Sequence, residues 1–140
     1  MATQPQQTLT PFEMIGGHPV IRRIVERFYD LMDQDPAYGE LRALHAPDLA
    51  PMRHSLAGFL AAWSGGPRDW FEENPGKCMM SAHKGIMIGP QVAEQWAGAM
   101  NSAIADCGPE NQVLGKEMAD MLSRMALAMG QRPAPATVTD

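Results

Sequence analysis

The residues of this chain best suited to hold a metal ion are its histidines, His18, His45, His54 and His83. They are too dispersed in the sequence to suggest a site with several protein ligands, and none are paired at helical spacing. The chain also has no G-x-S-x-G, Walker or H-E-x-x-H motif. Ordinary hydrolase and zinc chemistry therefore have no support in the sequence.

One histidine is enough when the metal arrives inside a macrocycle, because haem supplies four nitrogens and needs only a proximal side chain and an apolar slot. His83 suits that task, since its sequence neighbours are apolar on both sides: Met79, Met80, Ile86, Met87 and Ile88. The same pattern is typical of a structural histidine that is simply hydrogen-bonded in a core. By itself, His83 leaves both interpretations open.

Tyr29 and Trp96 each stand on an otherwise apolar helical pattern. A buried tyrosine or tryptophan needs a partner for its O–H or N–H, and that partner is either a bound ligand or a nearby carbonyl. The methionine stripe of the last helical segment, by contrast, is more typical of core packing than of a binding surface.

Helical segments must position these residues. Thr10-Pro11-Phe12-Glu13 is a capping box, which predicts a short helix that ends at Gly16-Gly17. Apolar residues at steps of three and four predict a second helix from His18 to about Asp33. Asp48 is the predicted cap of a third helix, which Gly65-Gly66-Pro67 stops.

The remaining segments follow the same rules. Residues 35–47 are predicted to be irregular or a short helical turn, and residues 68–80 a long loop. Gly89-Pro90 opens a helix that ends at Gly108-Pro109, and another runs from Val113 to Met129. No segment alternates with period two, so the predicted fold class is all-α with four substantial helices. Residues 1–9 and 131–140 are predicted to be disordered around one domain over residues 10–130.

The charge and composition of the chain limit which partners and compartments we expect. The 140 residues carry 16 acidic against 11 basic side chains, with no basic cluster, so nucleic acid is not an expected partner. No apolar run is long enough for a membrane span, and the polar N-terminus does not resemble a targeting peptide. Cys78 and Cys107 lack C-x-x-C spacing and are predicted to be free thiols. We expect a soluble cytoplasmic protein.

Several of these features together resemble group II truncated haemoglobins, over roughly residues 11–107. The similar features are the Gly16-Gly17 turn, Arg27-Phe28-Tyr29, and Trp63-Ser64-Gly65-Gly66-Pro67. Sixteen residues after that proline the family has its iron-binding histidine, here His83, and thirteen later a distal tryptophan, here Trp96.

The resemblance implies a two-on-two helical sandwich around haem b. It implies His83 as proximal ligand, with Tyr29, His45 and Trp96 as distal polar groups that face a bound ligand. It further implies an apolar haem wall formed by Met52, Leu56, Phe59, Leu60, Ile86 and Ile88.

The chain departs from the family pattern where haem propionates are usually held. Met79, Met80 and Ala82 replace the usual arginines before the proximal histidine, and Trp70 stands where tyrosine is common. The connection from Tyr29 to His45 is also about three residues longer than in many members. By charge or position, the candidate propionate anchors are Arg53, Lys77, Lys84 and Trp70, although a solvated surface role fits each of the charged ones.

Three functions remain open from the sequence. The first is reversible binding of O2, CO and NO at the haem. The second uses the same haem for redox turnover, such as NO oxidation or peroxide reduction, with electrons from an outside reductase. The third is an apo helical scaffold whose methionine-rich groove binds a partner helix. Under any of the three, the protein is expected to be a monomer or a homodimer.

Overall fold

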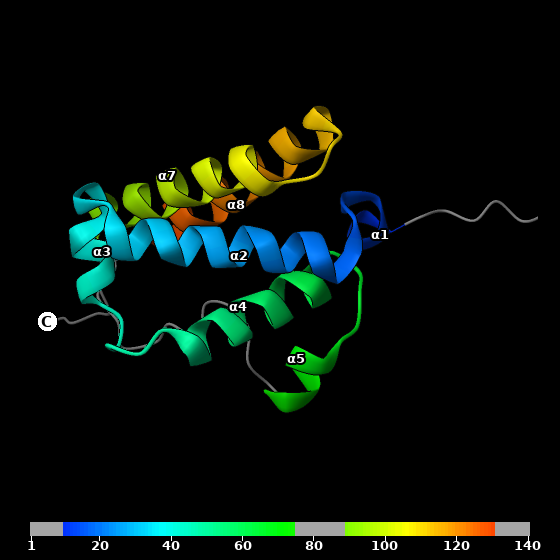
Figure 1. Ribbon diagram of the computed structural model, residues 1–140, viewed down its shortest axis with the longest axis horizontal. Helices are drawn as coiled ribbons and strands as arrows, with labels where there is room; N and C mark the ends of the chain where they lie inside the picture. Colours follow the sequence, from blue (N-terminus) through cyan, green and yellow to red (C-terminus); the bar gives the residue numbers. More distant parts are fainter. Residues whose placement is uncertain (1–9, 75–88, 131–140) are drawn as a thin grey trace, which may run out of the picture.

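The computed structural model describes residues 10–74 and 89–130, and every regular element within these ranges is helical (Figure 1). The predicted all-α class is therefore confirmed. The elements are α1 (Pro11–Ile15), α2 (Gly17–Gln34), the 3-10 helix η1 (Pro36–Tyr38), α3 (Gly39–Ala43), α4 (Ala50–Trp63), α5 (Asp69–Glu73), α7 (Pro90–Cys107) and α8 (Gln112–Gly130). None of these helices combines the length and apolarity needed to cross a bilayer.

The first helix is held by the predicted capping box. The Thr10 hydroxyl accepts from the Glu13 amide at 3.2 Å, and the Glu13 carboxylate accepts from the Thr10 amide at 3.0 Å. The Phe12 amide then donates to the Ser64 carbonyl at 2.8 Å, which joins α1 to the end of α4. A Cβ on Gly66 would lie 2.5 Å from Phe12 Cδ1, so the close approach of these segments requires a glycine.

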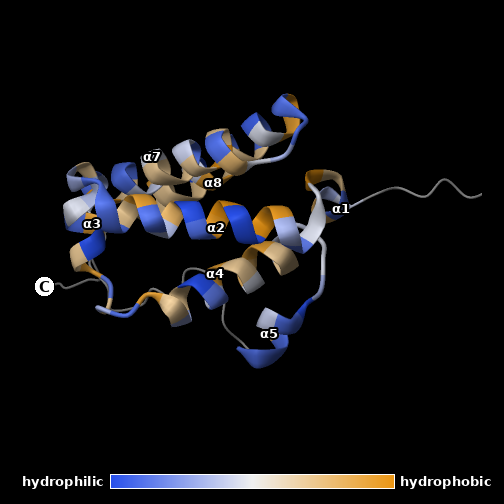
Figure 2. Cartoon of the chain, in the orientation of Figure 1, coloured by the Kyte–Doolittle hydropathy of each residue, from blue (hydrophilic) through white to orange (hydrophobic). Residues whose placement is uncertain are grey.

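Helix α2 crosses the middle of the molecule and packs against both α4 and α7 (Figure 1). Its buried residues are Ile21, Ile24, Val25, Phe28, Tyr29 and Met32. The spacing places them along one stripe, and Figure 2 shows polar and apolar residues alternating along α2 accordingly. This stripe is the centre of the hydrophobic core.

Helices α7 and α8 form the second layer, and they contact each other more extensively than any other pair. The buried face of α7 is rich in alanine, with Ala93, Ala97, Ala99 and Ala103 among its buried residues. Small side chains allow close helix packing, while Met118 and Leu122 of α8 fill the remaining core space. Helices α2 and α4 thus face α7 and α8 as two pairs.

Two segments differ from the sequence prediction. Residues 36–43 form η1 and α3, more regular structure than the single turn expected there. Within the predicted loop of residues 68–80, Asp69–Glu73 forms α5. A five-residue helix is too short to show a period in sequence, and burial of Trp70 against α4 contributes to holding it.

Candidate functional site

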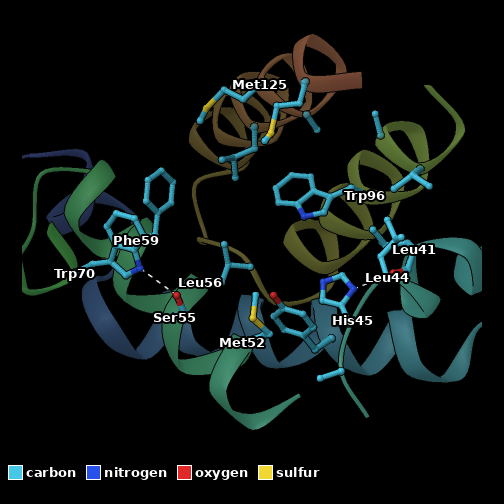
Figure 3. A pocket seen from close by; sticks show the side chains of 17 residues that line it. Leu41, Leu44, His45, Met52, Ser55, Leu56, Phe59, Trp70, Trp96 and Met125 are labelled. Carbon is cyan, nitrogen blue, oxygen red and sulfur yellow. Dashed lines mark hydrogen bonds between the residues drawn. The ribbon is translucent and has the colours of Figure 1, made fainter. Parts of the chain in front are cut away.

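A cavity of about 400 Å³ lies between the two helix pairs, a size typical of small-molecule and cofactor sites (Figure 3). Residues of α2, α3, α4, α5, α7 and α8 line it. The described lining residues are Tyr29, Leu41, Leu44, His45, Ala46, Met52, Ser55, Leu56, Phe59, Trp70, Val92, Ala93, Trp96, Leu122, Met125, Ala126 and Met129.

One wall comes from the apolar residues predicted on α4. Met52, Leu56 and Phe59 all line the cavity, at spacings of four and three residues that keep them on one helix face. Leu60, which was expected beside them, is fully buried in the hydrophobic core and is absent from the described lining. It lies one position on from Phe59, about 100° further around the helix, and packs toward the other core helices.

Tyr29 enters the cavity from α2. The residue is only 3% exposed. Within the described part of the chain, the Tyr29 hydroxyl donates to no protein acceptor. Every fully buried polar side-chain atom there has a hydrogen-bond partner, so this hydroxyl is not fully buried. The hydroxyl therefore opens to the cavity. Burial raises the pKa of Tyr29 well above its ordinary value, against a smaller lowering by the charge of Arg53. The phenol stays neutral and keeps its proton to donate.

Trp96 enters from α7, on the opposite side. Its ring meets Phe28 edge-on, with centroids 5.2 Å apart and planes at 60°, which fixes the indole against the core. Figure 3 shows Trp96 and His45 at the same end of the cavity. Tyr29 joins them there, because its ring centroid lies 6.0 Å from that of His45. The structure thus brings the three predicted distal groups together.

His45 follows α3, and its ring is oriented by the backbone. Nδ1 lies 2.9 Å from the carbonyl oxygen of Leu41. Because a carbonyl oxygen only accepts, Nδ1 must carry the hydrogen, and Nε2 of the neutral ring is then an acceptor. The Leu41 carbonyl thus selects the tautomer of the neutral His45 ring, which the sequence did not indicate.

A polar clamp holds this end of the cavity. Gln95, the residue before Trp96, accepts from the Leu41 amide at 3.0 Å and donates to the Glu40 carboxylate at 2.9 Å. These two hydrogen bonds fasten α3 to α7. They therefore hold the segment that carries His45 next to the helix that carries Trp96.

Trp70 of α5 lines the opposite end. Its indole N–H donates to the Ser55 hydroxyl at 3.1 Å, drawn as the dashed line in Figure 3. Its ring also meets Phe59 edge-on, with centroids 5.3 Å apart. The N–H that was considered for a propionate is therefore already used within the protein.

Arg53 of α4, another propionate candidate, pairs with α2 instead. Its guanidinium reaches Glu26 at 2.6 Å and Asp30 at 3.1 Å. Burial acts to raise the pKa of Glu26, but hydrogen bonds from Arg53 and Arg22 and their charges outweigh it and lower that pKa below its ordinary value. Glu26 therefore stays ionised and bound to Arg53 at neutral pH.

Five predicted site residues lie outside the described residues: Lys77, His83, Lys84, Ile86 and Ile88. Their assigned roles remain predictions.

The last helix, α8, also contributes to the cavity, which its sequence did not indicate. Leu122, Met125, Ala126 and Met129 line the cavity, so part of the methionine stripe that was expected to be core faces this space instead. Their spacing of three or four residues was visible, but one stripe serves a core and a cavity equally well. Leu41 and Leu44 were also missed, since their segment showed no clear period.

The cavity combines extended apolar walls with Tyr29, His45 and Trp96 at one end and the hydrogen-bonded pair Trp70 and Ser55 at the other. Such a cavity suits a large apolar group that carries or adjoins a small polar ligand, because Tyr29, His45 and Trp96 gather polar groups at one end of the described lining. Tyr29 and Trp96, which both line this end, carry an O–H and an N–H that can donate hydrogen bonds.

Comparisons with known proteins agree with this arrangement. The sequence profile of a family described as bacterial-like globin matches residues 10–131. A group II 2-on-2 haemoglobin from Agrobacterium tumefaciens is similar in structure, with a TM-score of 0.84 and 28% identity over 93% of this chain and 100% of that one. The haemoglobin of Chloroflexus aurantiacus gives a TM-score of 0.79 and 30% identity over 89% of this chain and 100% of that one. A group II truncated haemoglobin from Bacillus anthracis gives a TM-score of 0.80 and 27% identity over 94% of this chain and 98% of that one.

Proposed function

Because this chain belongs to the bacterial-like globin family and has the two-on-two fold of group II truncated haemoglobins, we propose that it reversibly binds O2, CO and NO at haem b. His83 is the proximal ligand in this proposal. The observation that carries it is the cavity between the helix pairs, where Tyr29 and Trp96 present donors among apolar walls.

The cavity lining fits the macrocycle. Apolar side chains from α4 and α8 face one another across the cavity, and they include Leu56, Phe59 and Met125. These walls exclude water and provide a low-dielectric surface for a flat apolar ring. Haem supplies, when bound, an iron that takes a diatomic ligand and shifts electron density onto it.

Tyr29 and Trp96 act on that ligand as hydrogen-bond donors. A donor aimed at an atom that gains negative charge stabilises the bound state more than the empty site. Each such bond contributes about 1.5 to 3 kcal/mol, which slows ligand escape by roughly tenfold or more. Slow escape suits ligand capture, or redox turnover with an outside reductase, better than bulk oxygen delivery.

The absorption spectrum of the purified protein tests the proposal. We expect a strong Soret band in the wild-type protein and in His54→Ala, a matched control because His54 is exposed on α4. We expect His83→Ala to lose the pigment or its normal gas affinity. A colourless wild-type protein that stays colourless when haemin is supplied would contradict haem binding. A normal His83→Ala spectrum with normal gas affinity would show that His83 is not the proximal ligand.

A further inference from the structure

Arg53 binds the part of α2 that carries Tyr29. Its Nη1 donates to the Glu26 backbone carbonyl at 3.1 Å and to Glu26 Oε1 at 2.6 Å, and its Nη2 donates to Asp30 Oδ1 at 3.1 Å. Glu26 and Asp30 are four residues apart and therefore share a face of α2. Tyr29, three residues after Glu26, lies beside that face, so Arg53 reaches the helix at the tyrosine.

The guanidinium also contacts the tyrosine ring. Its central carbon lies 5.7 Å from the Tyr29 ring centroid, within the distance at which a cation attracts an aromatic face. The Arg53 side chain is 20% exposed, so solvent screens this attraction only in part. A positive charge at the ring face favours negative charge on the phenol oxygen, which makes the hydroxyl a stronger donor.

We propose that Arg53 is a positioning residue for Tyr29: it holds the ring between α2 and α4 and strengthens the hydroxyl as a donor to the ligand in the cavity. This inference rests on the proposed function, and it replaces the propionate role considered for Arg53. The planar guanidinium explains why arginine serves here, because its several N–H groups bind two carboxylates and a carbonyl at once while its central carbon lies 5.7 Å from the ring centroid.

The chain supplies a matched control in Arg22. This arginine also pairs with Glu26, at 2.7 Å, but its side chain is 51% exposed and lies one turn earlier on α2. Within the described residues its recorded contact is this ion pair, and no cation contact with Tyr29 is found for it. Arg22→Met removes one cation from the same carboxylate and leaves the tyrosine contact in place.

A double-mutant cycle on the haem-loaded protein tests whether Arg53 acts through Tyr29. We expect Arg53→Met to raise the O2 dissociation rate roughly two- to tenfold, and Arg22→Met to leave it unchanged. In a Tyr29→Phe background, Arg53→Met should have no further effect. Arg53→Lys, which keeps the charge and loses the fork, should give an intermediate rate and also serves if the methionine variant does not fold.

A second measurement reports on the tyrosine directly. In a Tyr38→Phe background Tyr29 is the remaining tyrosine of the two in the chain, so its ring resonances in the CO-bound protein can be followed by NMR with labelled tyrosine. We expect Arg53→Met to shift these resonances and Arg22→Met to leave them in place.

The outcomes separate the inference from the proposed function. Equal rate changes from Arg53→Met with and without the Tyr29 hydroxyl, or unchanged Tyr29 resonances, would overturn the role of Arg53. An unchanged rate in Tyr29→Phe alone contradicts the donor role of Tyr29, and with it the claim that Arg53 strengthens that donor. A colourless protein contradicts the proposed function at the spectrum, before the cycle begins.

Discussion

The indole N–H of Trp70 donates to the hydroxyl of Ser55 across 3.1 Å, and this hydrogen bond joins α5 to the cavity wall on α4. Trp70 is 8% exposed, so loss of the acceptor leaves an N–H that is largely shielded from bulk water. The bond therefore bears on stability as well as on the shape of the cavity.

Ser55→Ala should lower the free energy of unfolding by roughly 1 to 3 kcal/mol, the usual cost of leaving a buried donor unpaired. Urea denaturation measures it. Ser123→Ala is the matched control, because its hydrogen bond to Asn101 is long, 3.4 Å, and exposed. Equal, small changes in both variants would show that water or another acceptor replaces Ser55.

Tyr29→Phe removes the hydroxyl and keeps the ring. We expect the O2 dissociation rate, measured by stopped flow, to rise at least several-fold, because a hydrogen bond to a charged acceptor is lost. Tyr38→Phe is the control, since Tyr38 is absent from the described cavity lining and its hydroxyl lies near Gly98 on α7. A rate equal to that of the wild-type protein would remove Tyr29 from the distal role.

Trp96→Phe removes the second donor while retaining an aromatic ring beside Phe28. The O2 dissociation rate should rise by roughly tenfold, for the same reason as at Tyr29. Trp63→Phe should leave the O2 dissociation rate unchanged. Trp63 is the last residue of α4, packs against the core and is not among the described residues that line the cavity. If both tryptophan variants release O2 equally fast, Trp96 has no specific contact with the ligand.

Gly66→Ala should destabilise the fold by about 1 to 3 kcal/mol, because the new methyl group would overlap the Phe12 ring and force the α1–α4 junction apart. Thermal or urea unfolding gives the value. Gly39→Ala has open space around it and a helical φ of -60°. It should be neutral or stabilise by about 0.4 to 1 kcal/mol, and a loss of stability there as large as at Gly66 would argue against a steric cause.

Glu26 gives the fold an acid-sensitive contact with Arg53. Its folded pKa is lowered, so its contribution to stability is present above the ordinary pKa of 4.5 and is lost as the pH falls through the lower folded value. Glu26→Gln should therefore flatten part of the decline in unfolding free energy below about pH 5. Glu117→Gln, at an exposed position on α8, should keep the wild-type slope, and an unchanged slope in Glu26→Gln would contradict the contribution.

The sequence by itself determined the long helices and the family. The capping box at Thr10, the apolar steps of α2, and the Gly-Pro boundaries of α7 are local signals, because caps and helical periods depend on residues a few positions apart. Tyr29, His45 and Trp96 were identified from a resemblance whose motifs lie in order along the chain, and the structure then placed them at one end of a cavity.

Only the tertiary structure decided which partners the polar groups take. Arg53 and Trp70 were propionate candidates by charge and position, yet Arg53 pairs with α2 and Trp70 with Ser55. The Leu41 carbonyl sets which nitrogen of His45 carries the hydrogen, and α8 turns Met125 and Met129 toward the cavity. These choices depend on which helix faces meet in space, and residues far apart in sequence carry no local pattern that reveals such a meeting.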